Sequence, residues 1–199
     1  TCSITDANGC ATTMSVDITQ PAAALATSIA DITPVGCFGD ATGSATITAT
    51  GGTTPYTYSW NTAPVQHAAT AVGLTAGNWT CTVTDANGCS TMRSISITQP
   101  TGRVMASAGT VQNVNCHGEA TGSANVVASG GTTPYTYSWN TAPEQTSSTA
   151  SNLAAGTWTC TVTDANGCSA SRAVTITQPA AALSSSLGSV SNVACYAGA

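Results

Sequence analysis

The amino-acid sequence predicts an all-β protein built of tandem immunoglobulin/PKD-like antiparallel β-sandwich repeats, and three observations support this fold class. First, TVTDANGC at 82–89 returns at 161–168, and SITDANGC stands at 3–10, so the chain repeats with a 79-residue period (161 − 82 = 79). Second, apolar and hydroxyl side chains alternate with period two in short segments, which is typical of strands. Third, turn sequences rich in Gly, Pro, Asn and Asp separate these segments.

The elements of one period follow in order along the chain. The expected strands cover residues 24–32, 43–50, 56–60, 79–85 and 91–98. Short strands spaced by about 8 to 12 residues, without helical periodicity, are typical of an antiparallel sandwich. The linkers before each unit contain little glycine, so we expect them to supply the first strand of the next domain.

The period also predicts the domain organisation. The expected parts are the C-terminal part of a preceding repeat, two full repeat units and the start of a following repeat, at 1–21, 22–100, 101–179 and 180–199. We therefore expect the chain to be a window onto a longer repetitive protein.

The Asp-Ala-Asn-Gly turn joins two strands whose apolar residues must share one face. These residues all have odd numbers: Trp79, Cys81, Val83, Ile95 and Ile97. Strand pairing therefore has to join odd to odd, which a three-residue loop achieves by placing Asp85 opposite Cys89. A two-residue Asn-Gly loop would move the isoleucines to the other face, so we reject it.

Composition excludes several classes of function. The chain has three arginines, no lysine and a net charge of −5, so clustered cations for nucleic acid are missing. No apolar run approaches the roughly 18 residues of a membrane helix, so we expect no membrane span in this segment. His67 and His117 occupy non-equivalent positions and no CxxC pair occurs, which argues against zinc. We expect no catalytic residues, because no pairing of nucleophile and base recommends itself.

Nine cysteines in a small acidic chain indicate an oxidising compartment and disulfides. Cys81 and Cys89 share a face about 13 Å apart along the ladder, too far for a bond. In a sandwich of immunoglobulin-like order, Cys37 lies near the start of the strand with Cys81, which favours two internal pairs: Cys37 with Cys81, and Cys116 with Cys160. Cys89 and Cys168 are then left either for inter-domain or inter-chain bonds or as buried free thiols, and the sequence leaves both interpretations open.

Two further sets of side chains have competing interpretations. Asp85 and Asn87, with Asp164 and Asn166, offer oxygen ligands for calcium, but the turn alone explains these residue types, and we expect no cofactor. An aromatic row in each unit is suited either to filling the core or to stacking on sugars: Tyr56, Tyr58 and Trp60, and Tyr135, Tyr137 and Trp139. We favour core filling.

Several motifs together resemble the SprB-type repeat of very large bacterial surface adhesins. They are the opening Cys-x-Gly, the Gly-Gly-x-x-Pro-Tyr-x-Tyr-x-Trp block at 51–60 and 130–139, and the Thr-Asp-Ala-Asn-Gly-Cys turn followed by Ile-Thr-Gln-Pro. Members commonly carry cysteines only at the positions of Cys37 and Cys89, so Cys81 is an addition here.

The resemblance implies a secreted, extracellular protein of the bacterial cell surface, serving as a structural or adhesive repeat of an adhesin or filament without catalysis. Its expected partners are neighbouring identical repeats or chains in a fibre, and surface glycans. The alternative from another class is a multivalent carbohydrate-binding array, in which the aromatic row contacts sugars.

Overall fold

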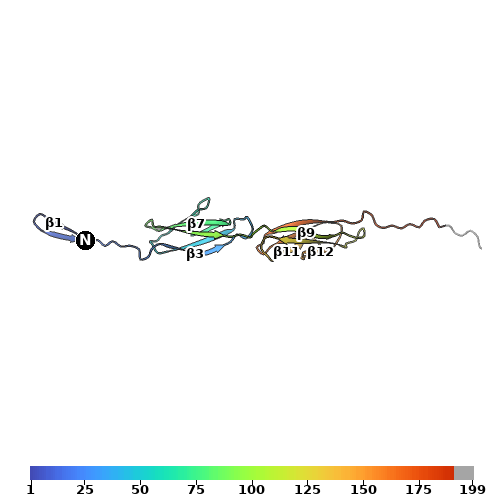
Figure 1. The fold of residues 1–199 in the computed structure, drawn as a ribbon, viewed down its shortest axis with the longest axis horizontal. Coiled ribbons are helices and arrows are strands. Elements are labelled where there is room, and N and C mark those ends of the chain that lie inside the picture. Colours follow the sequence, from blue (N-terminus) through green and yellow to red (C-terminus); the bar gives the residue numbers. More distant parts are fainter. Residues whose placement is uncertain (191–199) are drawn as a thin grey trace, which may run out of the picture. The chain divides into compact units, whose positions relative to one another are not determined.

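A computed structural model describes residues 1–190 of the chain. These residues form strands, turns and irregular segments without any helix, which confirms the all-β prediction (Figure 1). The chain divides into two compact units: Thr1–Val35 with Gly39–Gln99, and Gly36–Phe38 with Pro100–Ala199. The expected domain limits stay a prediction, and the last nine residues of the 180–199 segment lie outside the described residues.

The first unit contains a sandwich of two three-stranded antiparallel sheets. One sheet has the order β3-β4-β6, with strands Ala26–Thr33, Gly43–Thr50 and Thr70–Leu74. The other has the order β5-β7-β8, with strands Thr57–Trp60, Gly77–Thr84 and Ser90–Ile97. A separate hairpin pairs β1 (Cys2–Thr5) with β2 (Ala11–Met14). The linker before the period does supply the first strand, β3, as expected.

The second unit repeats this architecture one period later. Its first sheet has the order β12-β10-β9, with strands Thr149–Leu153, Gly122–Ser129 and Met105–Gln112. Its second sheet has the order β11-β13-β14, with strands Thr136–Trp139, Gly156–Thr163 and Ser169–Ile176. Both sandwiches therefore follow from one sequence pattern.

Each sandwich buries one face of each sheet in its own core. In the first unit, Ala45 and Ile47 of β4 face inward while intervening hydroxyl residues do not, as period-two alternation requires. Trp60 fills the centre at 1% exposure, and its ring nitrogen donates to the carbonyl of Ala68 at 2.9 Å. Trp139 does the same in the second unit, with the carbonyl of Ser147 as acceptor.

In the hairpin of β7 and β8, odd-numbered residues pair with odd-numbered residues, as the sequence predicts. Trp79 pairs with Ile95 and Val83 with Thr91, and the Asp85 N–H donates to the Cys89 carbonyl at 2.9 Å across the turn. Gly88 takes φ of +84°, the left-handed conformation that ends a three-residue loop of this kind. The predicted loop is confirmed, so Cys81 and Cys89 lie apart as expected.

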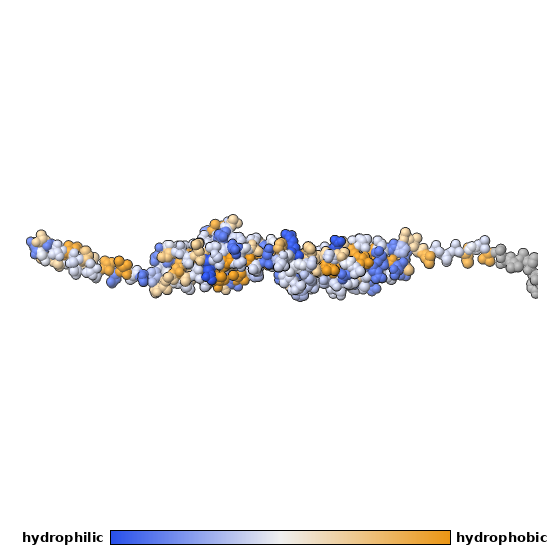
Figure 2. All heavy atoms as spheres, viewed as in Figure 1, coloured by the Kyte–Doolittle hydropathy of each residue, from blue (hydrophilic) through white to orange (hydrophobic). Residues whose placement is uncertain are grey.

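Hydroxyl side chains form part of the outer faces of the sheets. The Ser28 and Thr48 hydroxyls pair across strands at 2.7 Å, and those of Thr46 and Thr70 pair at 2.9 Å. In Figure 2 pale residues of intermediate hydropathy cover much of the visible face of the sandwiches. Within residues 1–190, no helix is long and apolar enough to cross a membrane.

Candidate functional site

The Asp-Ala-Asn-Gly-Cys turn of the second unit is organised around one carboxylate. One oxygen of Asp164 accepts the backbone N–H groups of Asn166 and Cys168, each at 2.9 Å. The other oxygen accepts the N–H of Thr132 at 2.8 Å, which ties the turn to the Gly-Gly-Thr-Thr-Pro loop. Burial raises the pKa of Asp164, but the N–H donors of Thr132, Cys168 and Asn166 lower it more, so the pKa lies below its ordinary value.

The first unit has the same turn. Asp85 accepts the N–H groups of Asn87 at 3.0 Å, Cys89 at 2.9 Å and Thr53 at 3.0 Å. The Thr53 donor, supported by those of Cys89 and Asn87, outweighs burial and holds the pKa of Asp85 below its ordinary value. The turn sequence thus fixes the position of the cysteine that follows it, in both units.

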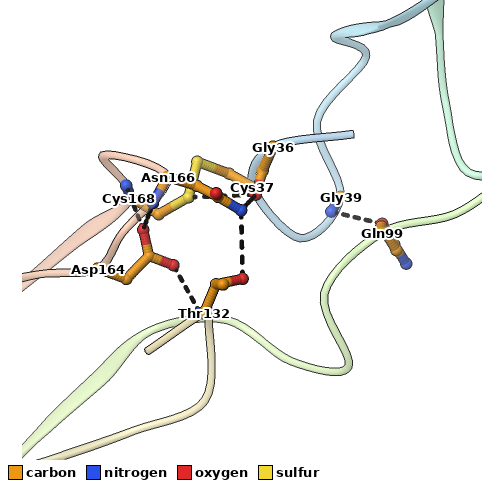
Figure 3. The surroundings of a disulfide bond; sticks show 8 residues. All are labelled: Gly36, Cys37, Gly39, Gln99, Thr132, Asp164, Asn166 and Cys168. Carbon is orange, nitrogen blue, oxygen red and sulfur yellow. Dashed lines mark hydrogen bonds between the residues drawn. A yellow bond between two sulfur atoms is a disulfide. The ribbon is translucent and has the colours of Figure 1, made fainter. Parts of the chain in front are cut away.

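A disulfide joins Cys37 to Cys168, with Cα atoms 5.7 Å apart (Figure 3). The bond lies within the second unit, to which the short segment Gly36–Phe38 belongs. The side-chain amide of Asn166 donates to the Gly36 carbonyl at 2.9 Å and to the Thr132 hydroxyl at 3.2 Å. The sulfur of Cys168 therefore meets a loop that is also held by hydrogen bonds beside it.

The observed bond corrects the expected pairing of Cys37 with Cys81. Cys81 lies in the middle of β7, opposite Trp60 and Arg93, and it is a fully buried free thiol. It lies four residues inside the strand from Gly77, about 13 Å from the end where the Cys37 loop begins, so a bond would require the loop to enter the core. Burial raises the pKa of the Cys81 thiol.

The expected pair of Cys116 with Cys160 is corrected for the same reason. Cys160 is buried in the core of the second unit beside Trp139, and Cys116 is an exposed free thiol. Of the two cysteines left for bonds between domains or chains, Cys168 is bonded to Cys37 and Cys89 is exposed and free.

The sequence leaves Cys168 open to a bond between domains, but it assigns Cys37 to a partner within its own period and so misses the bond between the two. The spacing shows only which cysteines are equivalent: Cys168 lies one period after Cys89 (168 − 89 = 79), and Cys116 lies one period after Cys37 (116 − 37 = 79). The bond thus joins the opening cysteine of one period to the turn cysteine of the next. The hydrogen bonds from the Thr53 and Thr132 N–H groups to the turn carboxylates were also missed. Every residue except proline has a backbone N–H, so the residue type does not show which one donates.

The oxygen atoms proposed for calcium have other partners. Both oxygens of Asp85 and of Asp164 accept backbone N–H groups, and Asn87 and Asn166 donate to threonine hydroxyls. Within the described chain, no group of three or more His, Cys, Asp or Glu is placed to hold a metal ion. The expected absence of a cofactor and the calcium alternative both stay untested, and the turn hydrogen bonds explain the residues present.

The aromatic row is divided between core and surface. Trp60 and Trp139 are each 1% exposed, whereas Tyr58 and Tyr137 are half-buried. The Tyr56 hydroxyl donates to the Gly51 carbonyl at 2.6 Å, and Tyr135 donates to Gly130 in the same way. The indole that would be the largest stacking surface for a sugar is therefore enclosed in each unit.

The geometry defines a class of protein, a tandem array of antiparallel β-sandwiches with immunoglobulin-like architecture. The family model described as SprB repeat matches residues 29–65 and 108–143. One of these matches falls in each sandwich. A search of curated proteins finds no match.

The matches among solved structures include three proteins with several domains. One is the three N-terminal domains of the bacteriophage RB49 Highly Immunogenic Outer Capsid protein, at 16% identity and a TM-score of 0.44, over 77% of this chain and 57% of that chain. Another is DIP-gamma IG1+IG2, at 9% identity and a TM-score of 0.32, over 77% of this chain and 98% of that chain. A third is Dpr2 Ig1-Ig2 in complex with DIP-Theta Ig1-Ig3, at 11% identity and a TM-score of 0.29, over 76% and 66%.

Proposed function

We propose that this chain is a non-enzymatic, load-bearing segment of an extracellular adhesin or filament on a bacterial cell surface. The single observation that carries the proposal is the Cys37–Cys168 disulfide, which joins one sequence period to the next. Its sequence separation of 131 residues exceeds one period, so it does more than close a loop inside one repeat. The SprB matches support a surface role, because repeats of this kind occur in surface-associated proteins.

The disulfide determines which strands carry a load applied to the two chain ends. Tension entering at Thr1 reaches Cys37, crosses the sulfur bridge to Cys168 and leaves along the remaining chain. The strands from β4 to β13 lie between the two cysteines in sequence, so they are bypassed. Of the two sandwiches, only β3 and β14 lie on the loaded path, and each is paired along one side to a protected neighbour.

The disulfide also supports an extracellular location, because oxidising compartments preserve disulfides that the cytosol would reduce. The scarcity of charge fits the same setting. With three arginines and no lysine, the chain offers few cleavage sites to proteases that cut after basic residues. The expected partners are neighbouring repeats of the same kind, because one repeat supplies Cys37 and the next supplies Cys168.

Single-molecule force spectroscopy on the full chain, pulled from its ends, tests the proposal. In the oxidised protein we expect no unfolding event that releases residues 38–167. Reduction adds the 131-residue separation to the extensible chain, a gain of roughly 430 to 470 Å at about 3.3 to 3.6 Å per residue. This additional length should appear in the force–extension curve when the two sandwiches unfold.

Two serine variants supply the matched comparison. Cys168→Ser removes the bond and should give the full extension without reductant, whereas Cys89→Ser removes the equivalent free thiol and should behave as the unmodified chain. Full extension of the oxidised, unmodified chain would contradict the proposal.

A further inference from the structure

Cys89 and Cys116 are the period-equivalents of the two bonded cysteines. Cys89 lies one period before Cys168, and Cys116 lies one period after Cys37. Both are exposed free thiols, whereas Cys37 and Cys168 are half-buried by their mutual contact. The chain therefore has a free turn cysteine, Cys89, and a free opening-loop cysteine, Cys116, which are the two kinds of cysteine that the Cys37–Cys168 bond joins.

The turn that holds Cys89 already has the conformation of the bonded turn. The Cys89 N–H donates to Asp85 at 2.9 Å, as the Cys168 N–H donates to Asp164 at 2.9 Å. The Asn87 amide donates to the Thr53 hydroxyl at 3.0 Å, and the equivalent Asn166 amide donates to the Thr132 hydroxyl at 3.2 Å. Asn166 uses the same nitrogen to bind the Gly36 carbonyl, so Asn87 offers the same donor to an incoming loop.

A cavity adjoins this thiol in the first unit. It has a volume of about 380 Å³ and is lined by Cys89 and Asp85 together with Pro21 and Leu25. The Cys89 residue therefore borders a partly apolar hollow in the surface of the first unit.

The loop that holds Cys116 has the conformation of the loop that holds Cys37. The Gly118 N–H donates to the Gln178 side chain at 2.9 Å, as the Gly39 N–H donates to Gln99 at 2.9 Å. Asn115 replaces Gly36, but the group used at that position is a backbone carbonyl, which any residue provides.

We propose that Cys116 of one copy of this chain forms a disulfide with Cys89 of a second copy, so that chains join head to tail through the junction seen at Cys37 and Cys168. This inference rests on the proposed load-bearing function and extends it from one chain to a covalent series. The two thiols lose two protons and two electrons in forming one S–S bond. A small-molecule disulfide such as oxidised glutathione accepts both and is released as two thiols.

The test uses the full chain with Cys2, Cys10 and Cys195 replaced by serine, so that other cross-links are removed. Two further variants are made in this background, Cys89→Ser and Cys116→Ser. Each is incubated alone and then mixed with the other in a glutathione redox buffer. The products are separated by non-reducing electrophoresis and their disulfides are identified by peptide mass spectrometry.

Neither variant alone can form the proposed bond, but the mixture retains one of each thiol. We expect covalent dimers at least tenfold more abundant in the mixture than in either variant alone, linked by Cys89 and Cys116. Dimers linked through two copies of Cys89 or of Cys116, or no excess in the mixture while Cys37–Cys168 is intact, overturn this inference and leave the proposed function standing. Absence of the Cys37–Cys168 bond itself overturns the proposed function.

Discussion

Replacing Trp60 by alanine should remove a large part of the stability of the first sandwich. The indole is 1% exposed, and burying a tryptophan removes about 150 to 250 Å² from water, worth about 4 to 6 kcal/mol at about 25 cal/mol per Å². Substitutions of this kind cost about 3 to 5 kcal/mol. The sandwich spans 72 residues from Ala26 to Ile97 (97 − 26 + 1), for which about 4 to 11 kcal/mol of stability is expected.

Urea unfolding followed by far-ultraviolet circular dichroism measures this loss. Trp139→Ala is the matched variant, because it empties the equivalent position in the other core. Trp60→Phe distinguishes the contribution of the aromatic ring from that of the indole N–H. It keeps an aromatic ring but loses the hydrogen bond to the Ala68 carbonyl, for an expected cost of about 1 to 3 kcal/mol. An unfolding free energy for Trp60→Ala within 1 kcal/mol of the unmodified chain would refute the buried role of the indole.

Two other predictions concern the turn carboxylates and the core thiols. Because the pKa of Asp85 and of Asp164 is lowered on folding, their stabilisation is complete above the ordinary value of 3.8 and is lost as the pH falls below it, so melting temperature should drop below about pH 4. Asp85→Asn leaves one acceptor oxygen for three N–H donors, so it should lower the melting temperature at pH 7 and flatten the acid dependence; an unchanged pH profile would count against this. Cys81→Ser buries a hydroxyl and should cost about 1 to 3 kcal/mol in urea unfolding, whereas Cys89→Ser should cost nothing measurable. Rapid alkylation of Cys81 by iodoacetamide in the folded protein would contradict its burial.

Much of the sandwich could be predicted from the sequence because alternation and turn chemistry are local. The parity of Trp79, Val83 and Ile95 was sufficient to choose the loop length at the turn, and the structure has that register. Strand β6 was missed because its sequence TAVGL is short and contains Gly73 at φ of +67°. Its buried residues, Ala71 and Leu74, are three apart, so the strand lacks a simple period-two pattern.

The disulfide could not be predicted by the same local argument. The sequence favours Cys81 because, in a sandwich of immunoglobulin-like order, the Cys37 loop lies near the start of the strand with Cys81, yet the parity of Cys81 with Trp79 and Val83 already places it on the core face. A core position in mid-strand is unreachable from a loop, and this constraint alone removes Cys81 from the set of partners. The remaining partner is a turn cysteine, and only the three-dimensional structure shows that it comes from the next period.

The choice between a bond inside a period and a bond to the next period has a physical consequence. A bond inside one period would stabilise that repeat but leave any load between repeats to the peptide link and the strands. The observed bond spans 131 residues, and by chain entropy a closed loop of that size restricts the unfolded state by about 5 kcal/mol. In the proposed load-bearing function, the same covalent link carries tension past β4 to β13. Any disulfide that closes a loop of this size gives the first effect, whereas the second effect needs a bond that bypasses both sandwiches, and the proposed mechanical role depends on this second effect.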